Sequence, residues 1–266
     1  MVHPLDGAQL KLARADIHLN AIKTAIQEFV GPDPDLIPGE FDRAAHQYVF
    51  RAQRDSRSPT WISPAIGDCV HNLRAALDYL VWELVGGASG GGTTSTEFPI
   101  FTDPLQYTRE APRKIRGVPR AAEAAFKALQ PFYGPNSDPF HPDWRDPERE
   151  PLAFLRDLER WDKHRSLNLT EDQVSAELVG FEQLGILVSP HPAVLPGRFE
   201  RGTVLARAEV PLGRPNVEVY LRATYDVTFG RHGPAYGEPV LQTLTSIRQE
   251  VAGRVLPVIA QFLPTD

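Results

Sequence analysis

Residues 61–85 have the longest unbroken helical period in the chain, and this segment constrains the fold more than any other. At about 100° per residue, nine of its apolar side chains fall on one broad stripe. They are Ile62, Ile66, Cys69, Val70, Leu73, Leu77, Leu80, Val81 and Leu84. A stripe of this width is stable only when it is buried against other elements. We therefore expect residues 61–85 to form the central helix of a helical core.

Polar side chains line both flanks of the same helix. His71, Arg74 and Asp78 fall within roughly 60° of one another, and Asp68 lies close to them. Asn72 lies on the opposite flank. Imidazole, guanidinium and carboxylate groups are the ones that bind anions and exchange protons in functional sites. The central helix is therefore the first place to expect a site.

A second helix, predicted for residues 151–168, carries charged groups on its own apolar face. Asp162 and Arg165 share that face with Leu158. Burying an unpaired charge is very costly, so both groups need partners, and the central helix can supply them. We therefore predict a polar cluster between the two helices. Its members are Asp68, Asn72, Arg74, Asp78, Asp162 and Arg165, with His71 and His164 as acid–base candidates.

Two interpretations of this cluster stay open. It is either an ion-pair network that fixes how the two helices dock or a functional cluster that lines a cleft. A sealed and fully hydrogen-bonded cluster would indicate architecture. An open cleft that gathers His71, Arg74, His164 and Arg165 would indicate chemistry.

Helical and extended patterns alternate along the rest of the chain. Residues 6–30 have a helical period, and three prolines and two glycines in residues 31–40 end it. The other regular segments are helices at 119–130 and 240–262 and strands at 46–51, 180–188, 203–210 and 217–229. This order predicts an α+β fold. We expect a helical bundle over residues 1–170, followed by antiparallel strands and a closing helix over residues 171–266, packed as one globular unit.

The composition restricts the classes of function. The 266 residues carry a net charge of −6 and a single cysteine, Cys69, which excludes an internal disulfide and a multi-cysteine metal site. Asp68 and His71 have the spacing of half a carboxylate-bundle metal site, but the sequence contains no second such pair. No run of about 18 apolar residues occurs. We expect a cytoplasmic protein with no membrane segment, no metal and no cofactor.

A basic stretch is the strongest local feature for polyanion binding. Five cations and one anion, Glu110, fall within twelve residues. The cations are Arg109, Arg113, Lys114, Arg116 and Arg120. Clustered cations of this kind attract polyanions, but no aromatic residue lies among them to stack on single-stranded bases. The alternative is a solvated loop surface that binds nothing.

Four strings between residues 66 and 168 resemble a group of uncharacterised bacterial proteins. In chain order they are GDCVHNLRAALDYL, TEFPIF, ALQPF and DKHRSLN. In that group a GDxxHNLRxALD helix precedes an FPIF segment, an LQP turn and a DKHR helix. The resemblance implies a helical core over this part of the chain and no particular activity.

The chain is also similar, more distantly, to HEPN domains, helical bundles that include ribonucleases of bacterial defence and toxin systems. Their cleavage motif is an arginine followed by a histidine, and RWDKH at 160–164 is one residue short of the usual spacing. The resemblance implies a metal-independent ribonuclease in which histidines transfer protons and arginines hold the scissile phosphate. The histidines are His71 and His164, and the arginines are Arg74, Arg160 and Arg165.

The same resemblance implies RNA as the partner and a homodimer as the assembly, because HEPN-like bundles often pair. The alternative comes from a different class of protein. It is a non-catalytic binding or scaffold protein in which the polar cluster is a structural ion-pair network. The convergence or separation of the histidines and arginines in space distinguishes the two.

Overall fold

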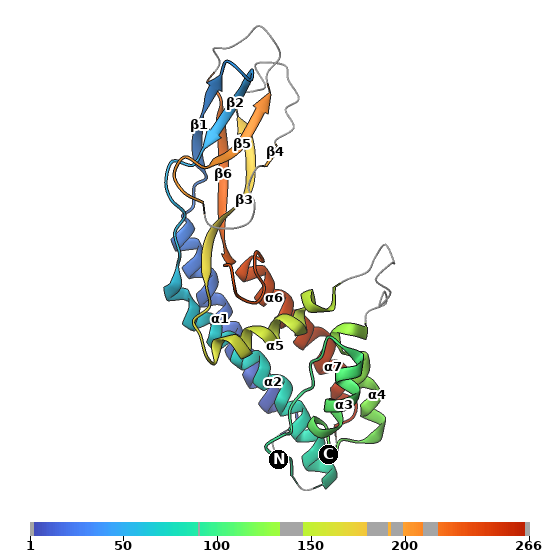
Figure 1. Cartoon of the computed structure of the whole chain (residues 1–266). Helices are drawn as coiled ribbons and strands as arrows, with labels where there is room; N and C mark the ends of the chain where they lie inside the picture. The colour runs from blue at the N-terminus through green and yellow to red at the C-terminus, as the bar shows by residue number, and fades with distance from the viewer. Residues whose placement is uncertain are drawn as a thin grey trace. The chain divides into compact units, whose positions relative to one another are not determined.

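The computed structural model describes residues 3–89, 91–133, 146–179, 191–192, 199–209 and 218–263. The chain divides into two units, each assembled from segments that are distant in sequence. The helical unit comprises Met1–Ile22, Ser63–Leu167 and Leu241–Asp266, and the sheet unit comprises Lys23–Ile62 and Asn168–Val240. Figure 1 shows the helices and strands of both units. The α+β class expected from the sequence is confirmed.

The centre of the helical unit is α2 (Ser63–Ser89), which contains most of the predicted apolar stripe. All nine side chains of the stripe are buried. The other helices are α1 (Asp6–Val30), α3 (Pro104–Lys114), α4 (Arg120–Ala128), α5 (Pro151–Asp162), α6 (Val240–Glu250) and α7 (Leu256–Ala260), with a π-helical segment η5 (Val251–Val255) and 3-10 turns η1 (Thr60–Ile62), η2 (Pro131–Tyr133) and η3 (Pro147–Arg149). No helix among the described residues is long and apolar enough to span a membrane.

Helix α1 runs antiparallel to α2 along its buried stripe. The thiol of Cys69 donates to the carbonyl oxygen of Ala15 at 3.7 Å, and Gly7 lies against the ring of Tyr79. Burial raises the pKa of Cys69 to about 12, with a smaller contribution from Asp16. The one cysteine is therefore an inert core thiol and takes no part in a site.

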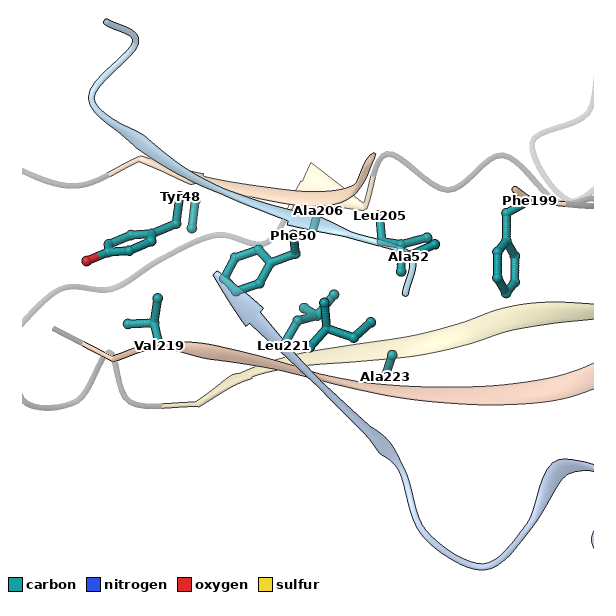
Figure 2. Packing of buried hydrophobic residues seen from close by; sticks show 11 residues of the cluster. Tyr48, Phe50, Ala52, Phe199, Leu205, Ala206, Val219, Leu221 and Ala223 are labelled. Atoms are coloured by element: carbon teal, nitrogen blue, oxygen red, sulfur yellow. The ribbon is translucent and has the colours of Figure 1, made fainter. Parts of the chain in front are cut away.

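The strands form one antiparallel sheet in the order β3-β6-β1-β2-β5-β4. They are β1 (Asp35–Asp42), β2 (Gln47–Arg51), β3 (Leu169–Val179), β4 (His191–Pro192), β5 (Val204–Glu209) and β6 (Tyr220–Phe229). Figure 2 shows that the sheet curls, so that Phe50 of β2 faces Leu221 of β6 across a filled interior. A Cβ atom at Gly39 of β1 would lie 2.8 Å from Val219 and 2.9 Å from Phe50. Only glycine leaves room at this position for the two core side chains.

The division into units differs from the boundary expected at residue 170. Strands β1 and β2 come from the N-terminal part of the chain but pair with β6 and β5 from the C-terminal part. Helix α7, near the C-terminus, packs against α2 and α4. Strand pairing and the burial of helix faces both join segments that are distant in sequence. A single boundary at one residue therefore cannot separate the two units. Strand β1 was not expected from the sequence, and the strand expected at 180–188 lies outside the described residues.

A buried carboxylate ties β3 to the segment that follows β2. Glu171 is fully buried and accepts hydrogen bonds from Nη1 and Nη2 of Arg54 at 2.6 and 2.9 Å. Arg57 donates to it from Nε, Nη2 and its backbone N–H at 3.2, 2.9 and 3.1 Å. Burial opposes the charged form, but these hydrogen bonds lower the pKa of Glu171 to about 2. The two guanidinium groups also lie over aromatic rings, Arg54 over Tyr225 and Arg57 over Phe29.

We expect Glu171→Gln to destabilise the protein by roughly 3 kcal/mol at about pH 7, because the amide keeps the shape but loses the charge that two guanidinium groups pair with. The pKa in the folded state lies below its ordinary value of 4.5. The stabilisation is therefore complete above that value and is lost as the pH falls toward 2. Denaturant unfolding of the full chain at about pH 7 and about pH 3 measures the difference, which should be smaller in acid.

Glu177→Gln is the matched control, because Glu177 is exposed and pairs at 2.9 Å with the exposed Arg222. A surface pair contributes at most about 1 kcal/mol, so this variant should unfold almost like the wild type. Equal losses of stability in the two variants would contradict the interpretation of Glu171 as a buried clamp.

Candidate functional site

Helices α2 and α5 pack against each other where Gly67 meets Asp162. A Cβ atom at Gly67 would lie 2.6 Å from Cγ of Asp162, closer than real contacts allow. The glycine therefore lets the end of α5 approach the backbone of α2. As a result, the Asp162 carboxylate lies directly on the surface of the central helix.

The surroundings of Asp162 disfavour its negative charge. Partial burial, and then the neighbouring carboxylates of Asp68 and Glu159, raise the pKa of Asp162, while His71 opposes the shift. Asp162 also occupies the last turn of α5, where the helix dipole is negative. Within the described part of the chain its side chain accepts no hydrogen bond and forms no ion pair. Because Asp68 and His71 are exposed, this half of the cluster is open to solvent.

The other half of the cluster is closed, and Arg74 is its centre. Nη2 of Arg74 lies 3.0 Å from Oδ1 of Asp78 and 3.2 Å from Oε2 of Glu97, and it donates to the carbonyl oxygen of Phe98 at 2.8 Å. Asp78 in turn accepts a hydrogen bond from the backbone N–H of Phe98 at 2.8 Å. Burial raises the pKa of Asp78, and Arg74 opposes that shift. With a side chain only 11% exposed, Arg74 is occupied by these contacts.

The closed half continues into α3 and toward α5 through Glu97. Lys114 donates to Glu97, and the ammonium group lies over the ring of Phe101. Burial opposes the charge of Glu97, but Lys114, Arg74 and Lys163 together hold its pKa below the ordinary value. Each charge in this half has an opposite charge beside it. Such a network fixes the docking of helices and leaves no free group for a ligand.

The four strings that carry the bacterial resemblance meet in this core. Buried Gln130 of ALQPF accepts from the backbone N–H of Phe101 and donates to the carbonyl oxygens of Pro99 and Phe126, each at 2.9 Å. The segment 97–101 is therefore held by α2 at one end and by Gln130 at the other. The contact of Gly67 with Asp162 joins the first string to the fourth. Packing and hydrogen bonding account for most residues of these motifs.

Other residues of the predicted cluster do not join it. Nδ2 of Asn72 donates to the carbonyl oxygen of Asp68 at 2.7 Å, within α2 itself. Helix α5 ends at Asp162, so His164 and Arg165 lie in the turn beyond it, and both are exposed. Arg165 stacks on the ring of Trp161 at 5.0 Å. The expectation that Arg165 is buried beside Leu158 is therefore wrong, because the helix does not continue far enough to turn it inward.

The basic stretch forms a separate feature on α3 and the turn that leads to α4. Helix α3 was not expected from the sequence. We call Arg109, Arg113, Arg116 and Arg120 the arginine patch; all four are exposed, and none forms an ion pair with another described residue. The negative charges of α3 and α4 are Glu110 and Glu123, and neither pairs with the patch. Lys114, the fifth predicted cation, is instead committed to Glu97.

Two kinds of chemistry remain for these groups. A carboxyl with a raised pKa beside an exposed histidine, as at Asp162 and His71, is able to exchange protons. The four guanidinium groups of the arginine patch, which have no ion pair with a described residue, are able to hold phosphates. No set of three or more histidine, cysteine or acidic side chains comes together as a metal-binding group among the described residues.

No protein-family model, curated protein or solved structure matches this chain. The likeness to HEPN domains and to the GDxxHNLRxALD group accordingly stays a prediction from the sequence. The function has to be argued from the side chains of the open half, the closed half and the arginine patch.

We expect Gly67→Ala to change the free energy of unfolding by less than about 1 kcal/mol, because the carboxylate at the end of the partly exposed Asp162 side chain has to move aside and this cost offsets the better helix propensity of alanine. Asp162→Ala removes the clashing atoms and should be neutral or slightly stabilising. The double variant should be more stable than Gly67→Ala, because no atom then has to move. Denaturant unfolding of the three variants gives the coupling energy of the pair. Strictly additive effects would show that the two residues do not touch.

Proposed function

We propose that this protein binds RNA without cleaving it and that the arginine patch is the contact surface. The observation that carries the proposal is the set of four exposed guanidinium groups within twelve residues, none with an acidic partner in the described part of the chain. Guanidinium groups pair with phosphates in a bidentate geometry. An RNA backbone offers phosphates at regular intervals, so several arginines can bind at once.

The polar cluster supports the non-catalytic part of the proposal. In the cleavage that the HEPN likeness implies, an arginine holds the scissile phosphate beside the acid and the base. Arg74 is the arginine on the same flank of α2 as His71, but its guanidinium group is bound to Asp78, Glu97 and Phe98. These contacts make it a structural residue. The proposed role of the cluster is therefore to hold the helical unit in one arrangement.

We expect replacement of the whole patch, R109Q/R113Q/R116Q/R120Q, to weaken RNA binding at least tenfold, because each lost guanidinium group removes a phosphate contact. Fluorescence anisotropy with an end-labelled RNA of about 20 nucleotides, at about 50 mM salt, measures the change.

The matched control is R43Q/R201Q/R207Q/R231Q, which removes the same number of charges from exposed arginines of the sheet unit. It should bind RNA within about threefold of the wild type, because on this proposal these arginines contact no phosphate and change only the net charge, whose effect is screened by salt. Equal weakening by the two variants would show that net charge, not the patch, controls binding. Absence of binding by the wild type would refute the proposed function.

A second candidate function, metal-independent RNA cleavage, is favoured by one observation. The pKa of Asp162 is raised in a setting that includes His71, and this part of the cluster is open to solvent. A histidine and a carboxyl group can exchange protons in phosphodiester cleavage. The likeness to HEPN domains points to the same chemistry, with His164 as a further candidate.

On the non-catalytic proposal, we expect labelled RNA to stay intact when incubated with the wild type, with or without a chelator. H71A/H164A should give the same result, as should H232N, a control at an exposed histidine of the sheet unit. Gel electrophoresis of the RNA after incubation measures its cleavage. Chelator-resistant cleavage that H71A/H164A lowers by about 100-fold or more, and that H232N leaves unchanged, would establish the second candidate and overturn the first.

A further inference from the structure

We infer that the arginine patch binds double-stranded RNA in preference to single strands and reads its phosphates alone. This inference rests on the proposed RNA binding and names the form of RNA that the patch fits. It is carried by three observations: the described residues 104–128 include no exposed aromatic side chain, their backbone is ordered, and a duplex has a higher charge density than a single strand.

The aromatic side chains close to the patch in the sequence are turned into the core. Phe101, Tyr107, Phe126 and Phe132 are all buried, and the rings of Phe101 and Phe132 each contact Tyr107. The exposed Tyr133 belongs to η2, which follows α4 in the sequence, and is not one of the residues of the patch. Proteins that bind single strands without base pairing depend on exposed aromatic side chains on which the bases stack. Among the described residues of α3, the turn after it and α4, no aromatic side chain is exposed, so these elements offer no such surface for stacking.

The arginines are held on a fixed scaffold. Arg109 and Arg113 are one helical turn apart, about 6 Å along the axis, on the side of α3 opposite buried Tyr107 and Ala111. The turn after α3 is closed by a hydrogen bond from the N–H of Val118 to the carbonyl oxygen of Ile115 at 3.2 Å. Gly117 completes it with a φ of +94°, which glycine adopts without strain. The backbone positions of the arginines are therefore fixed, and cations spaced by a fixed backbone suit a regular row of phosphates better than a flexible chain.

The higher charge density of duplex RNA favours its binding over that of single-stranded RNA. A duplex carries two phosphates per base-pair step, twice the charge of one of its strands. Counterion release gives a slope of log K against log salt of about −0.9 per contacted phosphate for B-form DNA and about −0.7 for a single strand, and we take the B-form value for the RNA duplex because it too carries two phosphate strands. A surface that offers only cations therefore gains more from a duplex. Phosphate contacts carry no base information, so unrelated duplexes should bind alike.

The test measures anisotropy of the full-length protein with three probes of about 20 nucleotides per strand: two duplex RNAs of unrelated sequence and an unstructured single strand. At about 50 mM salt we expect both duplexes to bind at least tenfold more tightly than the single strand and within about twofold of each other. Four phosphate contacts predict a duplex salt slope of about −3.6. Each of R109Q, R113Q, R116Q and R120Q should make the slope less steep by about 0.9.

Each outcome separates this inference from the proposed function. Equal or tighter binding of the single strand through the same four arginines would overturn the duplex preference and leave RNA binding by the patch intact. Duplex binding with a slope that none of the four substitutions changes would place the contact outside the patch and overturn both. Binding of one duplex sequence at least tenfold more tightly than the other would overturn recognition by phosphates alone. Failure of all three probes to bind would refute the proposed function itself.

Discussion

The guanidinium group of Arg74 holds the helical unit in one arrangement. From α2 it contacts Asp78, Glu97 and the carbonyl oxygen of Phe98. Glu97 also forms an ion pair with Lys114 of α3. A buried cation is stable only when its donors are satisfied, so these groups have to assemble together. The segment 97–101 and α3 are consequently fixed to the central helix. The arginine patch, whatever it binds, is therefore carried on a rigid support.

Sequence periodicity was sufficient for the long helices and insufficient for the short ones. Helix α2 was predictable because nine apolar residues at helical spacing leave no other way to bury them. Helix α3 was missed because charged residues and an internal Pro112 conceal its narrow buried face. Its signal was local: Asp103 caps the helix by accepting from the N–H of Leu105 at 2.8 Å, and Pro104 occupies the first turn. An aspartate followed by proline was enough to mark that helix start.

The sequence predicted the candidate site only where the period of a single helix sets the direction of a side chain. Asp162 reaches α2 because it shares a face with Leu158, whereas the end of α5 directly after it removes Arg165 from that face. No capping residue in the sequence marks this end, and five residues later the N–H of Leu167 donates to Oγ of Ser63 at 3.0 Å, which ties the chain to the start of α2. The partners of Arg74 were equally hidden, because the segment that supplies Phe98 has no periodic pattern. The clamp at Glu171 depends on strand pairing between distant segments, which one sequence does not reveal.

The net charge of −6 does not argue against a polyanion as the partner. Beyond roughly 8 Å in physiological salt, exposed charges scarcely interact, so a ligand responds to the local surface and not to the sum over the chain. Inside the helical unit the charges of Arg74, Lys114, Asp78 and Glu97 compensate one another at close range. The arginines of the patch have no such compensation among the described residues. The outer side of α3 is therefore locally cationic on an acidic protein, and that local excess is what a phosphate backbone would meet.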